Sequence, residues 1–204
     1  MLHTKTVTSS LFRVLKELME VADFRELYLV GGTSLALQIG HRESIDIDLF
    51  GKIDFNFDNF STTFAEMGEV SKIKMSKHIN ILLIDHIKVD FVNYRYPWIR
   101  ECLNVDGLRL ASIEDIGAMK LNAITGRGAK KDFVDLYFLL QQFTLQDLFR
   151  FYTQKFDDGN IFLVKKSLTY FVDAEREEMP LMYSDITWEE MKLFILEKIR
   201  EKDF

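Results

Sequence analysis

Residues 29–50 have the sequence LVGGTSLALQIGHRESIDIDLF, and this stretch predicts a strand, a glycine turn, a helix and a second strand. The apolar strand end runs into Gly31 and Gly32, and we expect a helix to start near Thr33. Glycine lets a backbone approach a ligand closely, and the first turn of a helix offers unpaired N–H groups to a phosphate. A simple tight turn is the alternative interpretation of the glycine pair.

Two acids share one face of the second strand, predicted at 45–50. Residues alternate there, so Ile45, Ile47 and Leu49 should point to one side while Asp46 and Asp48 point to the other. Two negative charges about 6 Å apart repel by about 3 kcal/mol at an effective dielectric near 20. A bound cation would remove this repulsion, whereas on an exposed strand water would screen it.

A third acid comes from another alternating segment, Ile87 to Asn93, which places Asp90 among residues typical of a buried sheet. A single acid in such surroundings needs a partner. Carboxylates from two strands form the hard-oxygen environment that magnesium prefers, with water and substrate phosphate completing the coordination. We therefore predict a metal site at Asp46, Asp48 and Asp90.

The rest of the chain divides into two parts by pattern. Up to Pro97, short strands alternate with helices, which indicates an α+β fold with a mixed sheet. From Ser112 onward nearly everything is typical of helices, beginning with the capping box Ser112-x-x-Asp115, so we predict a helical C-terminal bundle. The expected domains are 1–110 and 111–204. The expected helices are 9–22, 33 onward, 57–67, 113–124, 131–143, 145–156, 161–173 and 187–202, and the expected strands are 27–30, 45–50, 71–75, 79–85 and 87–93.

Lys120 is the single charge on the apolar stripe of the helix predicted at 113–124. An unpaired lysine facing inward is costly, so it should meet an anion, either a carboxylate or a substrate phosphate. The alternative is a lysine whose ammonium reaches water at the edge of the stripe.

A basic loop, Gly126-Arg127-Gly128-Ala129-Lys130-Lys131, follows this helix, and Asp132 and Asp135 come next on one helix face. This positive patch could steer a triphosphate or an RNA backbone toward a site. An ordinary solvated connection, with Asp132 favouring the helix N-terminus, is equally compatible with the sequence.

Composition limits the classes of function. A chain of 204 residues with 48% hydrophobic residues can bury one sizeable core. Because Cys102 is the single cysteine of the sequence, an intramolecular disulfide and a multi-cysteine zinc site are excluded. A net charge of −6 and a pI near 5.3 argue against general nucleic-acid binding, so any such contact must be local. Since no apolar run approaches membrane-spanning length, we expect a soluble, cytoplasmic protein with no membrane partner.

The order of these motifs resembles a known family. Gly31-Gly32-Thr33-Ser34-Leu35-Ala36-Leu37 precedes His41-Arg42-x-Ser44-x-Asp46-x-Asp48-Leu49-Phe50, and Lys120 precedes Lys131-Asp132-Phe133-x-Asp135-Leu136. This order is similar to that of the AbiEii/AbiGii toxin family of nucleotidyltransferases, the toxins of type IV toxin–antitoxin and abortive-infection systems. That family lies within the DNA polymerase β-like superfamily. The resemblance covers about residues 25–143.

The resemblance implies a polymerase β-like nucleotidyltransferase core with magnesium, two ions being expected, and a nucleoside triphosphate (NTP) as donor. The residues expected to bind the nucleotide are Gly31, Gly32, Thr33, Ser34, Arg42, Lys120, Asp132 and Asp135. Asp46, Asp48 and Asp90 would hold metal, Asp90 would also accept the proton of the attacking hydroxyl, and Lys120 would neutralise triphosphate charge.

The expected reaction moves a nucleoside monophosphate from an NTP to an acceptor hydroxyl. Some relatives use the acceptor end of tRNA, so the resemblance implies an RNA acceptor, a toxin role and a cognate antitoxin as partner. Two alternatives remain open from the sequence: nucleotidylation of a protein hydroxyl, and a non-catalytic module that binds an NTP or a partner protein.

Overall fold

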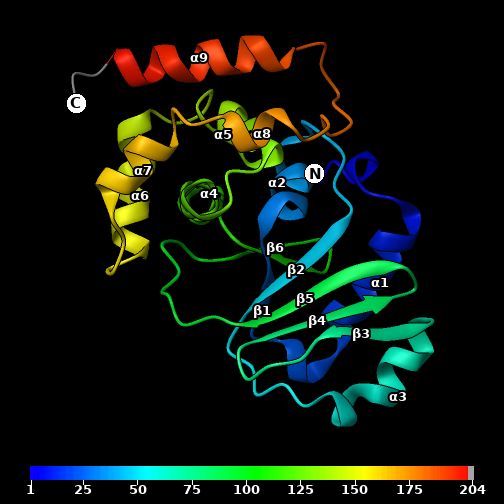
Figure 1. Ribbon diagram of the computed structural model, residues 1–204. Helices are drawn as coiled ribbons and strands as arrows, with labels where there is room; N and C mark the ends of the chain where they lie inside the picture. The colour runs from blue at the N-terminus through cyan, green and yellow to red at the C-terminus, as the bar shows by residue number, and fades with distance from the viewer. Residues whose placement is uncertain (202–204) are drawn as a thin grey trace. The chain divides into compact units, whose positions relative to one another are not determined.

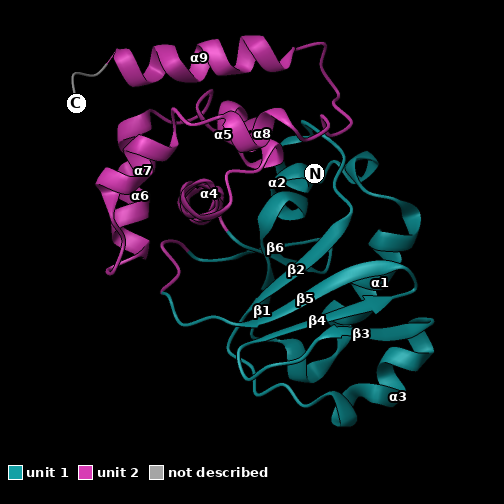
Figure 2. Cartoon of the chain, viewed as in Figure 1, with its two compact units in different colours: residues 1–96, 101–111 teal, residues 97–100, 112–204 magenta. Residues whose placement is uncertain are grey.

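The computed structural model describes residues 1–201 (Figure 1). The chain forms two compact units, coloured separately in Figure 2: residues 1–96 with 101–111, and residues 97–100 with 112–204. Across the described residues, no helix combines the length and apolarity that crossing a bilayer requires.

Unit 1 is built on a seven-stranded mixed sheet with the order β3-β4-β5-β2-β1-β7-β6. The strands are β1 (Leu27–Leu29), β2 (Asp46–Gly51), β3 (Val70–Lys74), β4 (Ile79–Ile84), β5 (Ile87–Asn93), β6 (Leu103–Val105) and β7 (Leu108–Leu110). Strand β2 pairs parallel to β5, and β1 pairs parallel to β7, while the other pairs are antiparallel. The predicted α+β class with a mixed sheet is confirmed.

Two of the described helices of unit 1, α1 (Ser9–Glu20) and α3 (Phe57–Met67), begin at side-chain caps. The others are η1 (Thr4–Thr6), η2 (Ala22–Phe24) and α2 (Gly31–Ile39). The Thr8 hydroxyl accepts the amide of Leu11 ahead of α1, and the Asn56 side chain accepts the amide of Asp58 ahead of α3. Helix α2 starts at Gly31, two residues before the expected Thr33, and its N-cap Val30 makes no side-chain capping bond.

One face of the sheet carries the core of unit 1. Helices α1 and α3 contribute apolar side chains to it, and the strands contribute Ile47, Leu49, Leu82, Ile84, Val89 and Phe91. Phe24, Phe64 and Phe91 are fully buried, and Phe24 packs on Phe91 with ring centroids 5.2 Å apart. Each such burial contributes about 1.5–3 kcal/mol. This packing determines which face of β2 and β5 remains for polar side chains.

Strands β6 and β7 form a hairpin that the sequence analysis did not predict. Its turn places Asp106 at φ 53° and Gly107 at φ 81°, the backbone that a two-residue hairpin favours. Arg109 on β7 then donates to the carbonyl oxygens of Met19, Phe24 and Leu27 at 2.7–3.1 Å. The hairpin therefore extends the sheet beside β1 and joins it to the end of α1.

Unit 2 is helical over its described residues, as predicted. Its helices are α4 (Ile113–Gly126), α5 (Lys130–Leu139), α6 (Leu145–Lys155), α7 (Ile161–Ser167), α8 (Val172–Glu175) and α9 (Trp188–Arg200). Full capping boxes start α6 at Thr144 and α9 at Thr187. The expected single helix over 161–173 is wrong, because the chain leaves the helix after Ser167 and the Thr169 hydroxyl donates to the carbonyl of Lys166.

The cap predicted at Ser112 forms in part. The Ser112 hydroxyl accepts the amide of Asp115 at 3.0 Å, which starts α4. The Asp115 carboxylate binds the buried ammonium of Lys155 at 2.6 Å and accepts the amides of Ile99 and Arg100. Asp115 thus fixes residues 97–100 to α4 and α6 within unit 2.

Candidate active site

The turn before α2 needs a glycine at residue 31. Gly31 has φ +69°, a left-handed conformation, and a Cβ there would collide with Oδ2 of Asp48. A Cβ on Gly32 would collide with Nη2 of Arg42. The glycine pair therefore allows the backbone to lie directly against one carboxylate and one guanidinium.

The parallel pairing of β2 with β5 places the three predicted acids on one face of the sheet. Asp48 is in register with Asp90, and Asp46 is in register with Lys88. The residues between them, Ile47 and Val89, are fully buried on the core side, so the polar side chains project from the opposite side. Neighbouring strands lie about 4.8 Å apart, which makes Asp48 and Asp90 direct neighbours.

One detail of the predicted alternation is wrong. Ile45 was expected on the apolar face with Ile47 and Leu49, yet its exposure is 63% whereas theirs is 0% and 1%. Strand β2 begins only at Asp46, so Ile45 lies outside the pairing that would direct it into the core.

Lys88 is the site residue that the sequence analysis missed. Its Nζ lies 2.5 Å from Oδ1 of Asp90, and the Asp90 side chain is only 18% exposed. The partner that an acid in this strand was expected to need is thus a lysine two residues away. The signal was present, since alternation along 87–93 places residues 88 and 90 on the same face.

The donor chemistry of Asp46 and Asp48 fits a hard divalent ion. Both carboxylates project from one strand, and the backbone of Gly31 lies against Asp48, where a side chain would fill the space. Within residues 1–201, no group of three or more His, Cys, Asp or Glu side chains is gathered closely enough to form a metal cluster. The third acid, Asp90, has a partner of its own, because the ammonium of Lys88 contacts its Oδ1.

Thr33 and Ser34 have structural side chains. The Thr33 hydroxyl hydrogen-bonds to the hydroxyl of Ser44 at 2.8 Å and to the main-chain carbonyl of Asp46, and Thr33 is 1% exposed. Ser34 is fully buried, and its hydroxyl accepts from the amide of Gln38 at 3.1 Å. These bonds fix α2 to the start of β2, so a phosphate could be met here by the main-chain amides of the first turn.

Arg42 places a buried positive charge beside the glycine turn. The residue is 3% exposed, and its Nη1 donates to the carbonyl of Glu43 at 2.8 Å while Nη2 lies against Gly32. A guanidinium in this position complements an anion at the N-terminus of α2. Unit 1 thus combines Gly31, Gly32, Arg42, Asp46 and Asp48 at one end of its sheet.

The remaining predicted residues lie together in unit 2. Lys120 on α4 is 4% exposed and binds Asp132 at 2.9 Å and Asp135 at 2.5 Å, both on α5. The inward lysine therefore meets anions, as expected, and they are carboxylates of the protein. Arg127 adds two hydrogen bonds to Asp132 at 2.8 and 3.0 Å.

This network controls the charge of Asp132. Burial alone would raise the pKa of its carboxyl group, but Lys120 and Arg127 outweigh burial and hold the pKa below its ordinary value of 3.8. Asp132 is fully buried, so the interpretation of a solvated helix start does not apply. Of the basic loop, Lys130 is also buried, and its main-chain amide donates to Glu177 at 2.8 Å.

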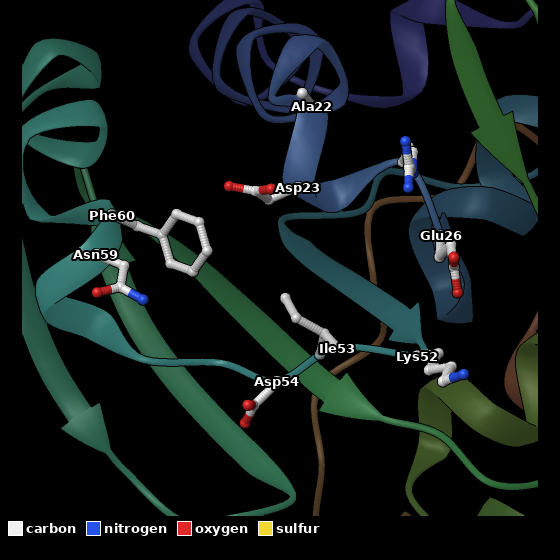
Figure 3. A pocket seen from close by; sticks show the side chains of 9 residues that line it. Ala22, Asp23, Glu26, Lys52, Ile53, Asp54, Asn59 and Phe60 are labelled. Carbon is white, nitrogen blue, oxygen red and sulfur yellow. The ribbon is translucent and has the colours of Figure 1, made fainter.

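A cavity of about 490 Å³ in unit 1 is lined by residues of 22–26 and 52–60 (Figure 3), and none of the three acids is among them. Its walls include Asp23, Lys52, Asp54 and Phe60, so both charge signs line it. Lys52 follows the last residue of β2, four positions beyond Asp48, which corresponds to about 13 Å along a strand. This cavity is therefore not the acid site.

Comparison with known proteins identifies the family. The family model described as nucleotidyl transferase AbiEii toxin, type IV toxin–antitoxin system, matches residues 13–204. The chain belongs to the AbiEii family. AbiEii proteins are nucleotidyltransferase toxins, and the chain is accordingly a nucleotidyltransferase of this toxin type.

Similar proteins match this chain over most of its length, and the similar solved structures share its fold. Uncharacterized protein aq_aa25 of Aquifex aeolicus (strain VF5) is 36% identical over 196 residues, which cover 92% of this chain and 93% of that protein. The crystal structure of JHP933 from Helicobacter pylori matches with a TM-score of 0.60 at 18% identity, covering 94% of this chain and 88% of that one. MenT4, nucleotidyltransferase toxin Rv2826c from Mycobacterium tuberculosis H37Rv, matches with a TM-score of 0.54 at 16% identity, covering 94% and 82%. The polymerase β-like core predicted from the motifs is consistent with this fold.

Proposed function

We propose that the chain transfers a nucleoside monophosphate from an NTP to a hydroxyl of RNA in a magnesium-dependent reaction, with tRNA as the first acceptor to test. The observation that carries this proposal is the register of β2 with β5, which places Asp48 beside Asp90 and Asp46 on the same face. The glycine turn at the start of α2 lies against Asp48. Acids beside a helix N-terminus are the arrangement that triphosphate chemistry needs.

The glycine turn, Arg42 and the acids of unit 1 each have a role in this reaction. The first-turn amides of α2 and the guanidinium of Arg42 bind the triphosphate, because they offer donors and positive charge at the same turn. Asp46 and Asp48 hold magnesium, which when bound neutralises phosphate charge as a Lewis acid. The oxygen of the acceptor hydroxyl forms a bond to the α-phosphorus, and the bond from that phosphorus to the pyrophosphate oxygen breaks.

Asp90 receives the proton of the acceptor hydroxyl in this proposal. Its Oδ1 is held by Lys88, so Oδ2 is the oxygen that takes the proton. Asp90 is in register with Asp48, which keeps this oxygen beside the carboxylates that hold the metal. Pyrophosphate is the leaving group, and Arg42 and the α2 amides neutralise the negative charge that it carries away.

Lys120, Asp132 and Asp135 belong to the nucleotide site in this proposal through the motif that they share with the AbiEii pattern. Their mutual ion pairs fix the position of the lysine on α4. Both aspartates contact the ammonium of Lys120 itself, and the shared motif gives this lysine the role of neutralising triphosphate charge. The partners of the proposed toxin are an NTP, an RNA acceptor and a cognate antitoxin.

A labelling experiment tests the proposal. The protein is incubated with magnesium, each α-³²P-labelled NTP in turn and total cellular RNA, and the wild type is expected to label RNA. Asp46→Asn and Asp48→Asn should reduce labelling by about 100- to 1,000-fold, since the carboxylates position the metal that neutralises the reacting phosphate. Asp54→Asn, a matched change in the separate cavity, should leave it unaltered. Labelling by Asp48→Asn equal to that of the wild type would refute the site. Label found in protein instead of RNA would show that the acceptor is a protein hydroxyl.

A further inference from the structure

Lys88 belongs to the same block of side chains as the three acids. In the parallel register it pairs with Asp46, just as Asp90 pairs with Asp48. Val89 and Phe91 are fully buried on the core side, so Lys88 and Asp90 project to the side of the acids. The block therefore contains three carboxylates and one ammonium.

The ammonium contacts Asp90 closely. Nζ of Lys88 lies 2.5 Å from Oδ1 of Asp90, within the range of a charge-assisted hydrogen bond. A magnesium ion binds carboxylate oxygen at about 2.0–2.1 Å and needs a lone pair directed at it. A second ion at Asp90 would therefore have to displace Lys88 from Oδ1 or bind Oδ2 beside it, and in either position the two positive charges would repel each other.

In two-metal sites the ions lie about 3.5–4 Å apart. Lys88 supplies a positive charge on Asp90, the acid that a second ion would need. Charge counting favours fewer ions. The ammonium of Lys88 and the guanidinium of Arg42 offset two of the three carboxylate charges, so one divalent ion brings the net charge to +1. A second divalent ion would bring it to +3 before the triphosphate arrives.

We infer that the site holds one divalent ion, on Asp46 and Asp48, and that the ammonium of Lys88 takes the place of a second ion at Asp90. This inference rests on the proposed function for the identity of the metal-binding acids. Lys88 is then a positioning residue: it holds Oδ1 of Asp90 and blocks a second ion.

Counting bound ions tests the inference without measuring activity. Mn²⁺ is titrated into the full-length protein, and the free ion is followed by its electron paramagnetic resonance signal. We expect one ion per chain for the wild type and for Lys88→Arg, which retains the charge, and two ions for Lys88→Met. Lys52→Met removes the same charge beyond the end of β2, in the wall of the separate cavity, and should keep one ion.

A double variant assigns the second ion. Adding Asp90→Asn to Lys88→Met should return the count to one, and circular dichroism and thermal unfolding should show that every variant folds. Two ions on the wild type, or one ion on a folded Lys88→Met, would overturn the inference. No ion on the wild type would overturn the proposed function as well, so the two failures are distinguishable.

Discussion

Replacing Gly31 with alanine changes the backbone and the acid site at the same time. The residue has φ +69°, which costs an alanine about 1–2 kcal/mol. The added Cβ would also meet Oδ2 of Asp48, and the carboxylate must move by about 1 Å to reach ordinary contact. Since this oxygen is at the end of a side chain that can rotate, the collision displaces the carboxylate more than it strains the fold.

Gly107→Ala separates the two effects. Gly107 has φ +81° in the turn between β6 and β7, and a Cβ there would meet nothing within 4 Å. Both variants should therefore lose about 2–8 °C in melting temperature, the shift expected for the backbone cost in a chain of this length. Only Gly31→Ala should also lose nucleotide transfer, by about 100-fold, the effect of a 1 Å misplacement at a reacting centre.

The assay measures melting temperature and labelled-nucleotide transfer for both variants, at a temperature where each is folded. The predicted result is similar melting temperatures with transfer lost only in Gly31→Ala. Full transfer by a folded Gly31→Ala would show that Asp48 does not need its position against the turn. Equal loss of transfer in Gly107→Ala would show that destabilisation alone explains the effect.

Two further predictions concern the network of unit 2. Lys120→Met should lower the free energy of unfolding by about 3–5 kcal/mol in urea titrations, because it leaves Asp132 and Asp135 buried with one cation fewer. Arg127→Ala should cost less, since the Arg127 side chain is 60% exposed, and the reverse order would contradict the burial argument. Because the folded pKa of Asp132 lies below 3.8, its stabilisation is fully present above about pH 4 and is lost as the pH falls through the folded value. The unfolding free energy of Asp132→Asn should therefore fall less between pH 5 and pH 3 than that of the wild type, and identical slopes would refute the prediction.

Alternation and spacing predicted much of the fold and of the acid face from sequence. The pattern of residues 45–50 placed Asp46 and Asp48 on one side because a strand has a fixed two-residue period. The stripe of α4 identified Lys120 as an inward charge, since helical periodicity is equally fixed. The sequence did not show that the partners of Lys120 are Asp132 and Asp135 on α5. That depends on three-dimensional packing, because the same aspartates could have faced water or a ligand.

Other features depended on interactions that local pattern does not encode. The hairpin of β6 and β7 had a signal in Asp106-Gly107, flanked by alternating apolar residues, but its strands are only three residues long. The pairing of Asp115 with Lys155 joins residues 40 positions apart, so periodicity could not reveal it. Alternation along the strand could have placed Lys88 on the same face as Asp90. Their contact could not be predicted, because it depends on the side-chain conformation of a long, flexible residue.

The most direct test of the central claim is a crystal structure with Mn²⁺ and a non-hydrolysable NTP, in which anomalous scattering locates the ion. The account predicts a peak about 2.0–2.3 Å from carboxylate oxygens of Asp46 and Asp48, with the triphosphate on the first turn of α2. An ion bound elsewhere, or a triphosphate away from Gly31 and Gly32, would contradict it.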